Sequence, residues 1–382
     1  MTISQKRNES RRSGREPRGI VVRIALLAAC CAAGCNLSGG VHQRTDQSSR
    51  LTETAAFISG LDIPASSPFN YLAAKNDYLA YKKRMDGAWS SFVKNDLSRI
   101  EVWRGRNLGL KKYRTLFYPF SGPDIVNALA FFPDADEYIL IGLEPPGRVP
   151  EPLAMGPDRV FTELRALRTA LNTLLNLNYF RTLEMKLELN ENGFNNISCI
   201  MIFFISRSGY RIVDVRNISL PRSDTDRGGT GAGTVRGVEI SFSKNSFSGN
   251  KKAYYFTANL SDKGLNASRF ADYLKRRAHF VTFMKSAAYL PGLNSFSTIR
   301  GLILANSDYI LHDDSCIPIR FFPERDWETT YFGKYRVLKM FRKWYQPDLA
   351  AKMKEKNAGP LDFSFGYGYT PEESHLIFSR RR

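Results

Sequence analysis

The stretch "TLFYPFSGPDIVNALAFFPDADEYILIGLEPPG", residues 115–147, sets out the local order of structure most clearly in this sequence. It predicts a short strand, a turn, a short helix and then a second strand at 137–144. Between the two strands, Pro123 suits the first turn of a helix, and Asp124 is favourable at its positive end. The proline-rich segment after the second strand predicts a loop. Asp124 and Glu144 therefore stand at the ends of elements, where polar side chains can converge on a cleft.

The rest of the chain predicts helices around a β-rich centre. Apolar residues spaced three or four apart predict amphipathic helices over 71–107 and 158–177, and helices are also expected around 267–290, 296–306 and 337–356. Turn residues between apolar runs predict β-hairpins near 197–220 and 235–260. The predicted fold class is α+β, with an antiparallel sheet of at least four strands packed by amphipathic helices.

The first 35 residues have the pattern of an export signal. Residues 1–23 are polar and rich in arginine, and the short apolar run "IALLAACCAAGC" comes next at 24–35. This run is much shorter than the roughly 20 residues that a membrane-spanning helix needs. The segments "LAAC" and "AAGC" both resemble a bacterial lipobox, in which the chain is cleaved before a cysteine and that cysteine is lipid-modified. Cys35 is the preferred lipidation site and Cys30 the alternative.

These features predict a domain organisation and a location. Residues 1–35 form the lipoprotein-type signal peptide, and residues 36–68, rich in Ser, Thr, Gly and Gln, form a flexible tether. Residues 69–382 form a globular α+β body, with a division placed near 150–180. Acyl chains on a cysteine would hold this body at a membrane without a spanning helix. The expected location is the bacterial cell envelope, lipid-anchored, on its periplasmic or outer-surface side.

Charge and cysteine content narrow the partners. The chain of 382 residues has a net charge of +18, and a basic body favours anionic partners. Because export makes nucleic acid improbable, the expected partners are the membrane, through the lipid, and an anionic envelope polymer or an envelope protein. Cys199 and Cys316 are the cysteines of the body, and an oxidising compartment permits either a disulfide between them or free buried thiols. No Cys/His metal spacing occurs, and neither a metal nor a cofactor is predicted.

The stretch "YILHDDSCIP", residues 309–318, contains the densest set of reactive side chains. Asp313 and Asp314 are candidate catalytic carboxylates, alongside Glu144 and Asp124. The same residue types are also common turn-formers, so a structural turn is the competing interpretation. The glycine-rich "GGTGAG", residues 228–233, lacks a preceding strand and a following helix, which predicts a hairpin loop and not a phosphate-binding loop.

Several strings in this chain resemble a pattern of uncharacterised bacterial exported proteins. They are "YPFSGPD" (118–124), "FFPDADEYILIGLEPPG" (131–147), "YILHDDSCIPIRFF" (309–322) and "FGKY" (332–335), and the resemblance covers about residues 80–370. In that pattern glycine usually stands at the position of Cys316, which weakens Cys316 as a nucleophile. The resemblance implies no activity.

Two functions are consistent with these observations. The first is a membrane-anchored envelope lipoprotein acting as a non-enzymatic binding or interaction module. The alternative is a carboxylate-dependent hydrolase or transferase that acts on an envelope polymer and uses Asp313 or Asp314 with Glu144 and Asp124. The alternative requires these carboxylates to share a cleft.

Overall fold

The computed structural model describes residues 38–111, 113–177, 189–220, 234–245, 249–336 and 338–382. The chain divides into two compact units, Met1–Asp46 and Gln47–Arg382, and the second unit contains every strand of the described chain. Cys30, Cys35 and the glycine-rich segment 228–233 lie outside the described residues. Within the described residues, no helix is both long and apolar enough to cross a bilayer.

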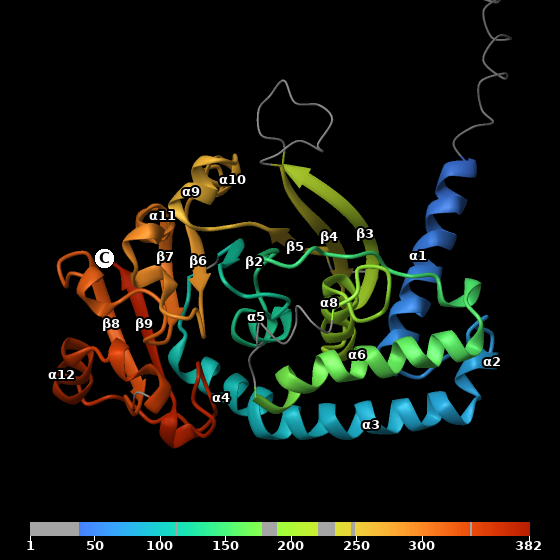
Figure 1. Ribbon diagram of the computed structural model, residues 1–382, viewed down its shortest axis with the longest axis horizontal. Helices are drawn as coiled ribbons and strands as arrows, with labels where there is room; N and C mark the ends of the chain where they lie inside the picture. Colours follow the sequence, from blue (N-terminus) through green and yellow to red (C-terminus); the bar gives the residue numbers. More distant parts are fainter. Residues whose placement is uncertain (1–37, 112, 178–188, 221–233, 246–248, 337) are drawn as a thin grey trace, which may run out of the picture. The chain divides into compact units, whose positions relative to one another are not determined.

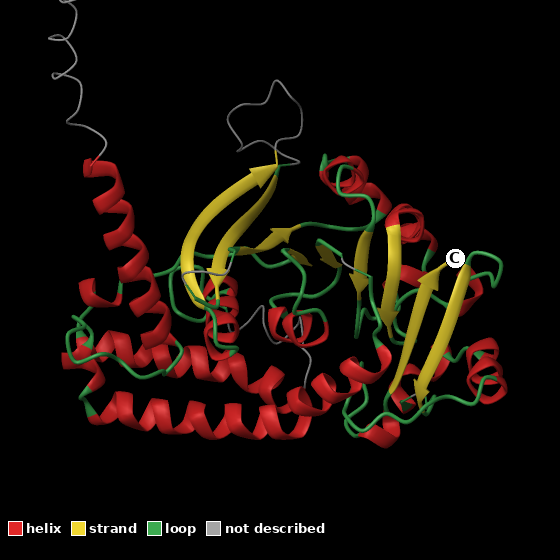
Figure 2. Cartoon of the chain, turned by 180° about the vertical axis from the view of Figure 1, so that it is seen from behind, coloured by secondary structure: helices red, strands yellow, loops and turns green. Residues whose placement is uncertain are grey.

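Nine strands of the described chain form one sheet, in the order β3-β4-β5-β2-β1-β6-β7-β9-β8. The central strands, β5, β2, β1, β6 and β7, are all parallel. An antiparallel pair extends the sheet at each end, β3 with β4 and β9 with β8 (Figures 1 and 2). The bounds are β1 Thr115–Tyr118, β2 Glu137–Gly142, β3 Arg211–Leu220, β4 Val235–Ser243, β5 Lys251–Thr257, β6 Phe280–Phe283, β7 Ser307–His312, β8 Trp327–Gly333 and β9 His375–Arg381.

Helices cover both faces of this sheet because its parallel strands are apolar on both faces. Along β1, Leu116 and Tyr118 belong to one buried cluster, and Phe117 belongs to the other. The first cluster includes residues of α1 (Ser38–Ile58), α2 (Asn70–Ala73), α3 (Asn76–Phe92), α4 (Ser98–Asn107), α5 (Ile125–Phe131), α6 (Pro157–Leu177) and α8 (Ile197–Arg207). The second includes residues of α9 (Asp262–Asn266), α10 (Phe270–Lys275), α11 (Ser297–Asn306) and α12 (Pro347–Glu355).

The mixed sheet corrects the predicted antiparallel one. The antiparallel pairing of 235–243 with 251–257 is confirmed. The central strands are parallel because α5, the helix pair α9–α10, and α11 each carry the chain back before the next strand begins. Numbered along the chain, the parallel strands run 3-2-1-4-5, which is a doubly wound arrangement.

The predicted hairpin near 197–220 is wrong in its first half. Residues Ile197–Arg207 form α8, and every residue from Ile197 to Ser206 is buried. Asn196 caps this helix, since its side-chain oxygen accepts a hydrogen bond from the Cys199 N–H at 2.9 Å. A short, predominantly apolar run fits a buried helix as well as a buried strand, so periodicity could not separate them.

Two further segments differ from expectation. The helix expected over 267–290 is the short α10 followed by the strand β6, because "FVTF" is a run of β-favouring residues buried between neighbouring strands. The predicted flexible tether, residues 36–68, is instead largely occupied by α1. Phe57 and Ile58 of α1 are fully buried, and the Tyr81 hydroxyl donates to the Ile58 carbonyl at 2.6 Å. The packed body therefore begins before residue 69.

Candidate functional site

The candidate site lies where the two halves of the sheet diverge. From the carboxyl end of β1 the chain passes through α5 to β2, on one side. From the carboxyl end of β6 it passes through α11 to β7, on the opposite side. Loops that leave neighbouring strands in opposite directions open a crevice, and open α/β sheets bind ligands there.

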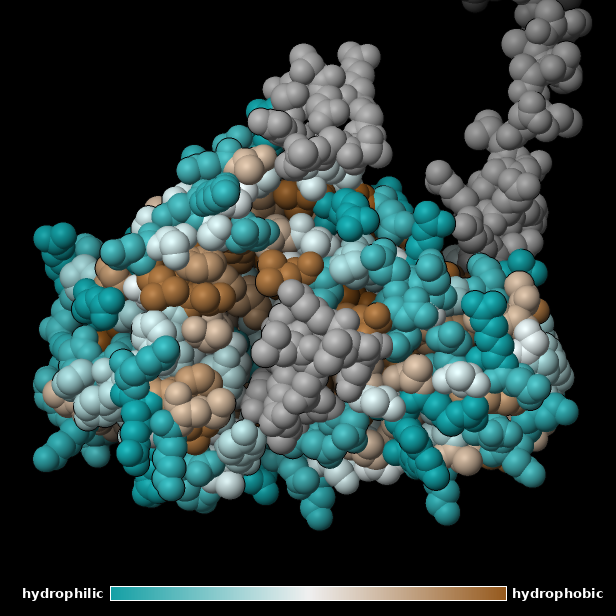
Figure 3. Space-filling model, in the orientation of Figure 1, coloured by the Kyte–Doolittle hydropathy of each residue, from teal (hydrophilic) through white to brown (hydrophobic). Residues whose placement is uncertain are grey.

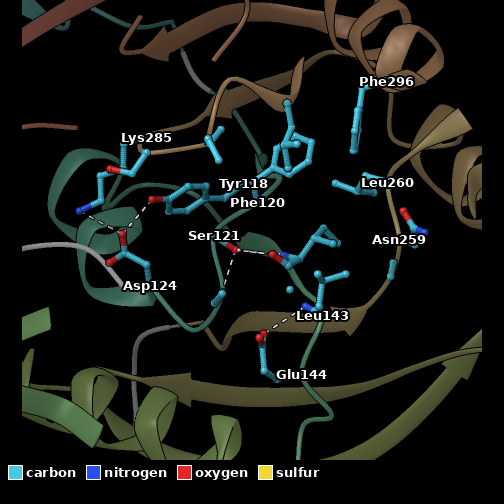
Figure 4. A pocket seen from close by; sticks show the side chains of 18 residues that line it. Tyr118, Phe120, Ser121, Asp124, Leu143, Glu144, Asn259, Leu260, Lys285 and Phe296 are labelled. Carbon is cyan, nitrogen blue, oxygen red and sulfur yellow. Dashed lines mark hydrogen bonds and ion pairs between the residues drawn. The ribbon is translucent and has the colours of Figure 1, made fainter. Parts of the chain in front are cut away.

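A cleft occupies this position and encloses about 880 Å³, counting its open mouth (Figure 4). Its walls come from the segments that follow β1, β2, β5 and β6, together with Phe296 near α11. A concave site lined by apolar side chains and a few polar groups is typical of small-molecule sites in proteins. Four segments that are distant in sequence therefore build one cavity.

One part of the cleft is apolar. The rings of Phe120 and Phe296 lie 5.9 Å apart at an angle of 61°, and Leu260 lies beside them in Figure 4. Leu143, which also lines the cleft, is 53% exposed. On the face drawn in Figure 3, hydrophobic side chains also gather over the region where Figure 1 labels β6 and β2. These surfaces could hold a flat apolar group.

A buried ion pair forms another part of the wall. The Lys285 ammonium lies 3.2 Å from Asp124 Oδ2, which also accepts a hydrogen bond from the Tyr118 hydroxyl at 2.8 Å. Asp124 Oδ1 accepts hydrogen bonds from the backbone and side-chain N–H groups of Asn127. Burial lowers the pKa of Lys285, against the opposing effect of Asp124. Asp124 thus caps α5 as predicted and neutralises a buried cation.

Glu144 has a different environment in the same cleft. Its carboxylate is buried; Oε2 accepts a hydrogen bond from the Leu143 N–H at 3.1 Å. Its backbone carbonyl accepts hydrogen bonds from Tyr255 and Thr257 at 2.9 and 2.8 Å, which fixes the turn after β2. Among the described residues, no group hydrogen-bonds the buried Oε1 atom. Because buried polar atoms are normally hydrogen-bonded, water or a ligand is the expected partner of this oxygen.

The loops around the cleft contain strained backbone. Phe120, Ser286 and Ala288 line the cleft with φ angles of 59°, 53° and 52°, in the left-handed region that side-chain-bearing residues rarely adopt. The Ser286 hydroxyl is buried and has no hydrogen-bond partner among the described residues. Strain of this kind persists where the surroundings enforce it, and it clusters at functional sites.

Asp313 supports the cleft but does not line it. Its Oδ2 accepts a hydrogen bond from the Ser286 N–H at 2.9 Å, and its Oδ1 accepts from the Ser315 N–H and hydroxyl and from the Cys316 thiol. Burial raises the pKa of Asp313, and the donors from Ser315 and Ser286 oppose that shift. Asp313 therefore joins the loop after β7 to the strained loop after β6.

Asp314 belongs to a separate buried cluster. Its carboxylate accepts a hydrogen bond from the Tyr289 hydroxyl at 3.0 Å and lies 3.3 Å from His375 Nε2. Its backbone carbonyl accepts from Gln346 at 2.8 Å. Of the predicted carboxylates, the structure brings Asp124 and Glu144 into one cleft and leaves Asp313 and Asp314 outside it.

The cysteines of the body are both free and buried. Burial raises the pKa of the Cys316 thiol well above its ordinary value, and the neighbouring Asp313 raises it further. Such a thiol is a poor nucleophile. No group of three His, Cys, Asp or Glu side chains in the described part of the chain is arranged to hold a metal ion.

Sequence reasoning missed Lys285, Ser286 and Phe296. Lys285 and Ser286 fall inside a predicted helix, which hid their position at the end of a strand. The signal available was "FVTFMKSAAY", an apolar run ending in polar and small residues. No family model, curated protein or solved structure matches the chain.

Proposed function

We propose that this protein is a membrane-tethered module of the bacterial cell envelope that binds a small organic ligand in the cleft between β1, β2, β5 and β6. The observation that carries the proposal is the pair of buried polar groups in that cleft, Glu144 Oε1 and the Ser286 hydroxyl, which have no partner among the described residues. Buried polar groups are normally satisfied, so a ligand that supplies their hydrogen bonds would be stabilised.

Binding is favoured over catalysis by the state of Asp124. Both of its carboxylate oxygens already accept hydrogen bonds or pair with Lys285. A general base needs a free lone pair directed at the proton that it removes. Asp124 is therefore better suited to hold the cleft in shape than to transfer a proton.

The cleft proposal is tested by analysing what the purified full-length protein carries. Small molecules released by denaturation would be identified by mass spectrometry for the wild type and for Leu143→Trp, which narrows the mouth of the cleft. Val102→Trp, at a 50% exposed position of α4, is the matched control. We expect a molecule that the wild type and the control release and that Leu143→Trp does not. The same set of molecules from all three proteins would overturn the proposal.

The membrane tether is supported by the N-terminal sequence, in which Cys35 or Cys30 is the acylated residue. We expect the intact mass of the membrane-extracted protein to match a cleaved, triacylated chain. The acylated form should disappear in Cys35→Ser and persist in Cys30→Ser. If Cys30→Ser alone removes it, Cys30 is the anchor. An unprocessed, unacylated chain would exclude the envelope location.

A carboxylate-dependent hydrolase or transferase acting on an envelope polymer is the second candidate. It is favoured by one observation, that Asp124 and Glu144 share the cleft, whereas Asp313 and Asp314, which the alternative also names, lie outside it. This candidate predicts that incubation with cell-wall polymer in water either shortens the polymer, with water as the acceptor, or redistributes its chain lengths, with a second polymer chain as the acceptor. Glu144→Gln should abolish the change.

A further inference from the structure

The place of Glu144 in the sheet resembles that of a ribose-binding acid. In doubly wound sheets, the acid that accepts ribose hydroxyls follows the second strand, roughly 20 residues after the glycine turn that ends the first. Glu144 follows β2, and Gly122, with a φ of 54°, lies in the turn that ends β1. A buried carboxylate oxygen without a partner at this point, among the described residues, could accept a hydrogen bond from a ribose hydroxyl.

The apolar part of the cleft suits the base of a nucleoside. Phe120 and Phe296 present two rings to the cavity, and Leu260 lies next to them (Figure 4). Aromatic side chains hold flat heterocycles by stacking and by burying their apolar faces. A base at these rings and a ribose at Glu144 together use both kinds of surface that the cleft offers.

The same cleft lacks, among its described residues, the features that hold a phosphate. Dinucleotide-binding sheets place the pyrophosphate at the N-terminus of the first helix. Here the carboxylate of Asp124 occupies that end of α5, because it accepts the hydrogen bond of the Asn127 N–H. Among the described residues that line the cleft, the side chains with a formal charge are Asp124, Glu144 and Lys285, whose formal charges sum to −1. Lys285 is already paired with Asp124, so added negative charge would be repelled.

We propose that the cleft binds a ribonucleoside moiety that carries no phosphate, with its ribose hydroxyls donating to Glu144 and its base against Phe120 and Phe296. This inference rests on the proposed ligand-binding function and names the chemical class of the ligand. The probes for it are adenosine and S-adenosylhomocysteine, the second of which carries a zwitterionic amino-acid tail in place of phosphate.

The test is isothermal titration of the full-length protein with adenosine, 2′-deoxyadenosine, S-adenosylhomocysteine, AMP and ATP. We expect the two ribonucleosides to bind, and 2′-deoxyadenosine and the phosphates to bind at least about tenfold more weakly. In Glu144→Gln, adenosine should lose about tenfold in affinity, and its advantage over 2′-deoxyadenosine should disappear. Glu151→Gln, at an exposed position after β2, is the control and should behave as the wild type.

The discrimination between adenosine and 2′-deoxyadenosine separates a direct contact from a structural effect, since a merely destabilised cleft would weaken both equally. AMP or ATP binding as tightly as adenosine would overturn the inference about phosphate. The same titrations include a cell-wall disaccharide. If the disaccharide bound to the wild type but not to Leu143→Trp, and adenosine did not bind, the nucleoside class would be overturned. That outcome would leave the ligand-binding function standing. Failure of every probe would overturn the nucleoside inference. The proposed ligand-binding function would also be overturned only if the purified wild type and Leu143→Trp released the same molecules.

Discussion

Asp124 and Glu144 are carboxylates of one cleft, yet their surroundings give them different roles. Asp124 is held by Tyr118, Lys285 and Asn127, which leaves it no free oxygen. Glu144 uses one oxygen on the Leu143 N–H and keeps the other unpaired among the described residues. The partners of each oxygen, and not the residue type, decide which carboxylate can receive a ligand.

Ala288 allows a test of the strain at the cleft. It is exposed and has a φ of 52°, so its methyl group contributes little packing but incurs the cost of the left-handed region. Ala288→Gly should raise the free energy of unfolding by about 1 kcal/mol in urea denaturation, because glycine removes that cost. Ala350→Gly, in the middle of α12, should lower it by about 1 kcal/mol. A loss of stability in both variants would show that position 288 is unstrained.

His312 should make the stability depend on pH. Burial lowers the pKa of His312 from 6.5 to about 4, and its Nδ1 lies 2.9 Å from the Asp313 carbonyl oxygen. The folded state therefore resists protonation between pH 6.5 and 4, whereas the unfolded chain takes up the proton. Stability contributed by the neutral ring is present above pH 6.5 and is lost as the pH falls toward 4.

The measurement is the free energy of unfolding at pH 7 and pH 5. The His312 contribution to the difference should be about 2 kcal/mol, with the wild type less stable at pH 5. His312→Asn keeps an N–H near the Asp313 carbonyl and removes the titration, so its pH dependence should be smaller by that amount. An unchanged pH dependence would assign the effect to other groups.

Polar contacts at the C-terminal end of α8 join this helix to neighbouring elements. Arg207, at the last turn of α8, donates to the carbonyls of Ser59 and Gly60 and pairs with Asp86 at 2.6 Å. Its side chain thereby joins α8 to the turn after α1 and to α3. Figures 1 and 2 show α3 and α6 side by side beneath this junction. These contacts help to set how α8 packs against other helices of the same apolar cluster.

The Asp124–Lys285 pair joins the β1–α5 turn to the end of β6. Asp124→Asn should lower the free energy of unfolding by about 3 kcal/mol, because it removes the carboxylate that lies 3.2 Å from the buried Lys285 ammonium. Asp77→Asn breaks a pair with Arg165 in which both side chains are more than half exposed, and it should cost less than about 0.5 kcal/mol. Equal small losses in both variants would show that Lys285 is neutral in the folded protein.

Across the whole molecule, the cleft depends on the order of the strands. Its walls come from loops after β1, β2, β5 and β6, which are separated by up to about 170 residues in the chain. The doubly wound order brings the carboxyl ends of these strands together. The antiparallel pairs at both ends extend the sheet without entering the cleft.

A second surface feature is the cationic segment Lys334–Tyr345, which includes the short helix η6 (Lys339–Trp344). Its exposed residues include cations and two large apolar side chains, Met340 at 72% and Tyr345 at 52% exposed. The exposed cations are Lys334, Arg336, Lys339, Arg342 and Lys343, and no acidic residue occurs among residues 334–347. Cations beside exposed aromatic and apolar side chains are typical of surfaces that lie against anionic membranes.

This segment should bind anionic lipid independently of the lipid anchor. A full-length Cys30→Ser/Cys35→Ser chain should sediment with vesicles of phosphatidylglycerol and phosphatidylethanolamine, and less so as salt is raised. Replacing Lys339, Arg342 and Lys343 with Gln should weaken binding by about 3 kcal/mol. Replacing Lys83, Arg84 and Lys263, exposed cations on other elements, should have a smaller effect. Equal binding to neutral vesicles would contradict an electrostatic contact.

The sequence by itself determined the local elements whose signals are periodic or capped. The amphipathic helix at 157–177 and the Asp124 cap depend on neighbours a few residues away, and both are confirmed. The interpretation of the basic N-terminal run and its short apolar segment as an export signal is supported by the sequence alone. Acidic residues at the ends of predicted elements also singled out Asp124 and Glu144.

Only the tertiary structure decided the direction of the strands, the nature of 197–207 and the membership of the cleft. An apolar run such as "ISCIMIFFIS" is buried on all sides in either conformation, so packing chooses between helix and strand. Whether Asp124 meets Glu144 or Asp313 depends on which strands are neighbours, and strand order is set by long-range pairing that leaves no periodic mark. Local interactions therefore determine the individual helices and strands, whereas burial of both faces of the sheet determines which loops form the cleft.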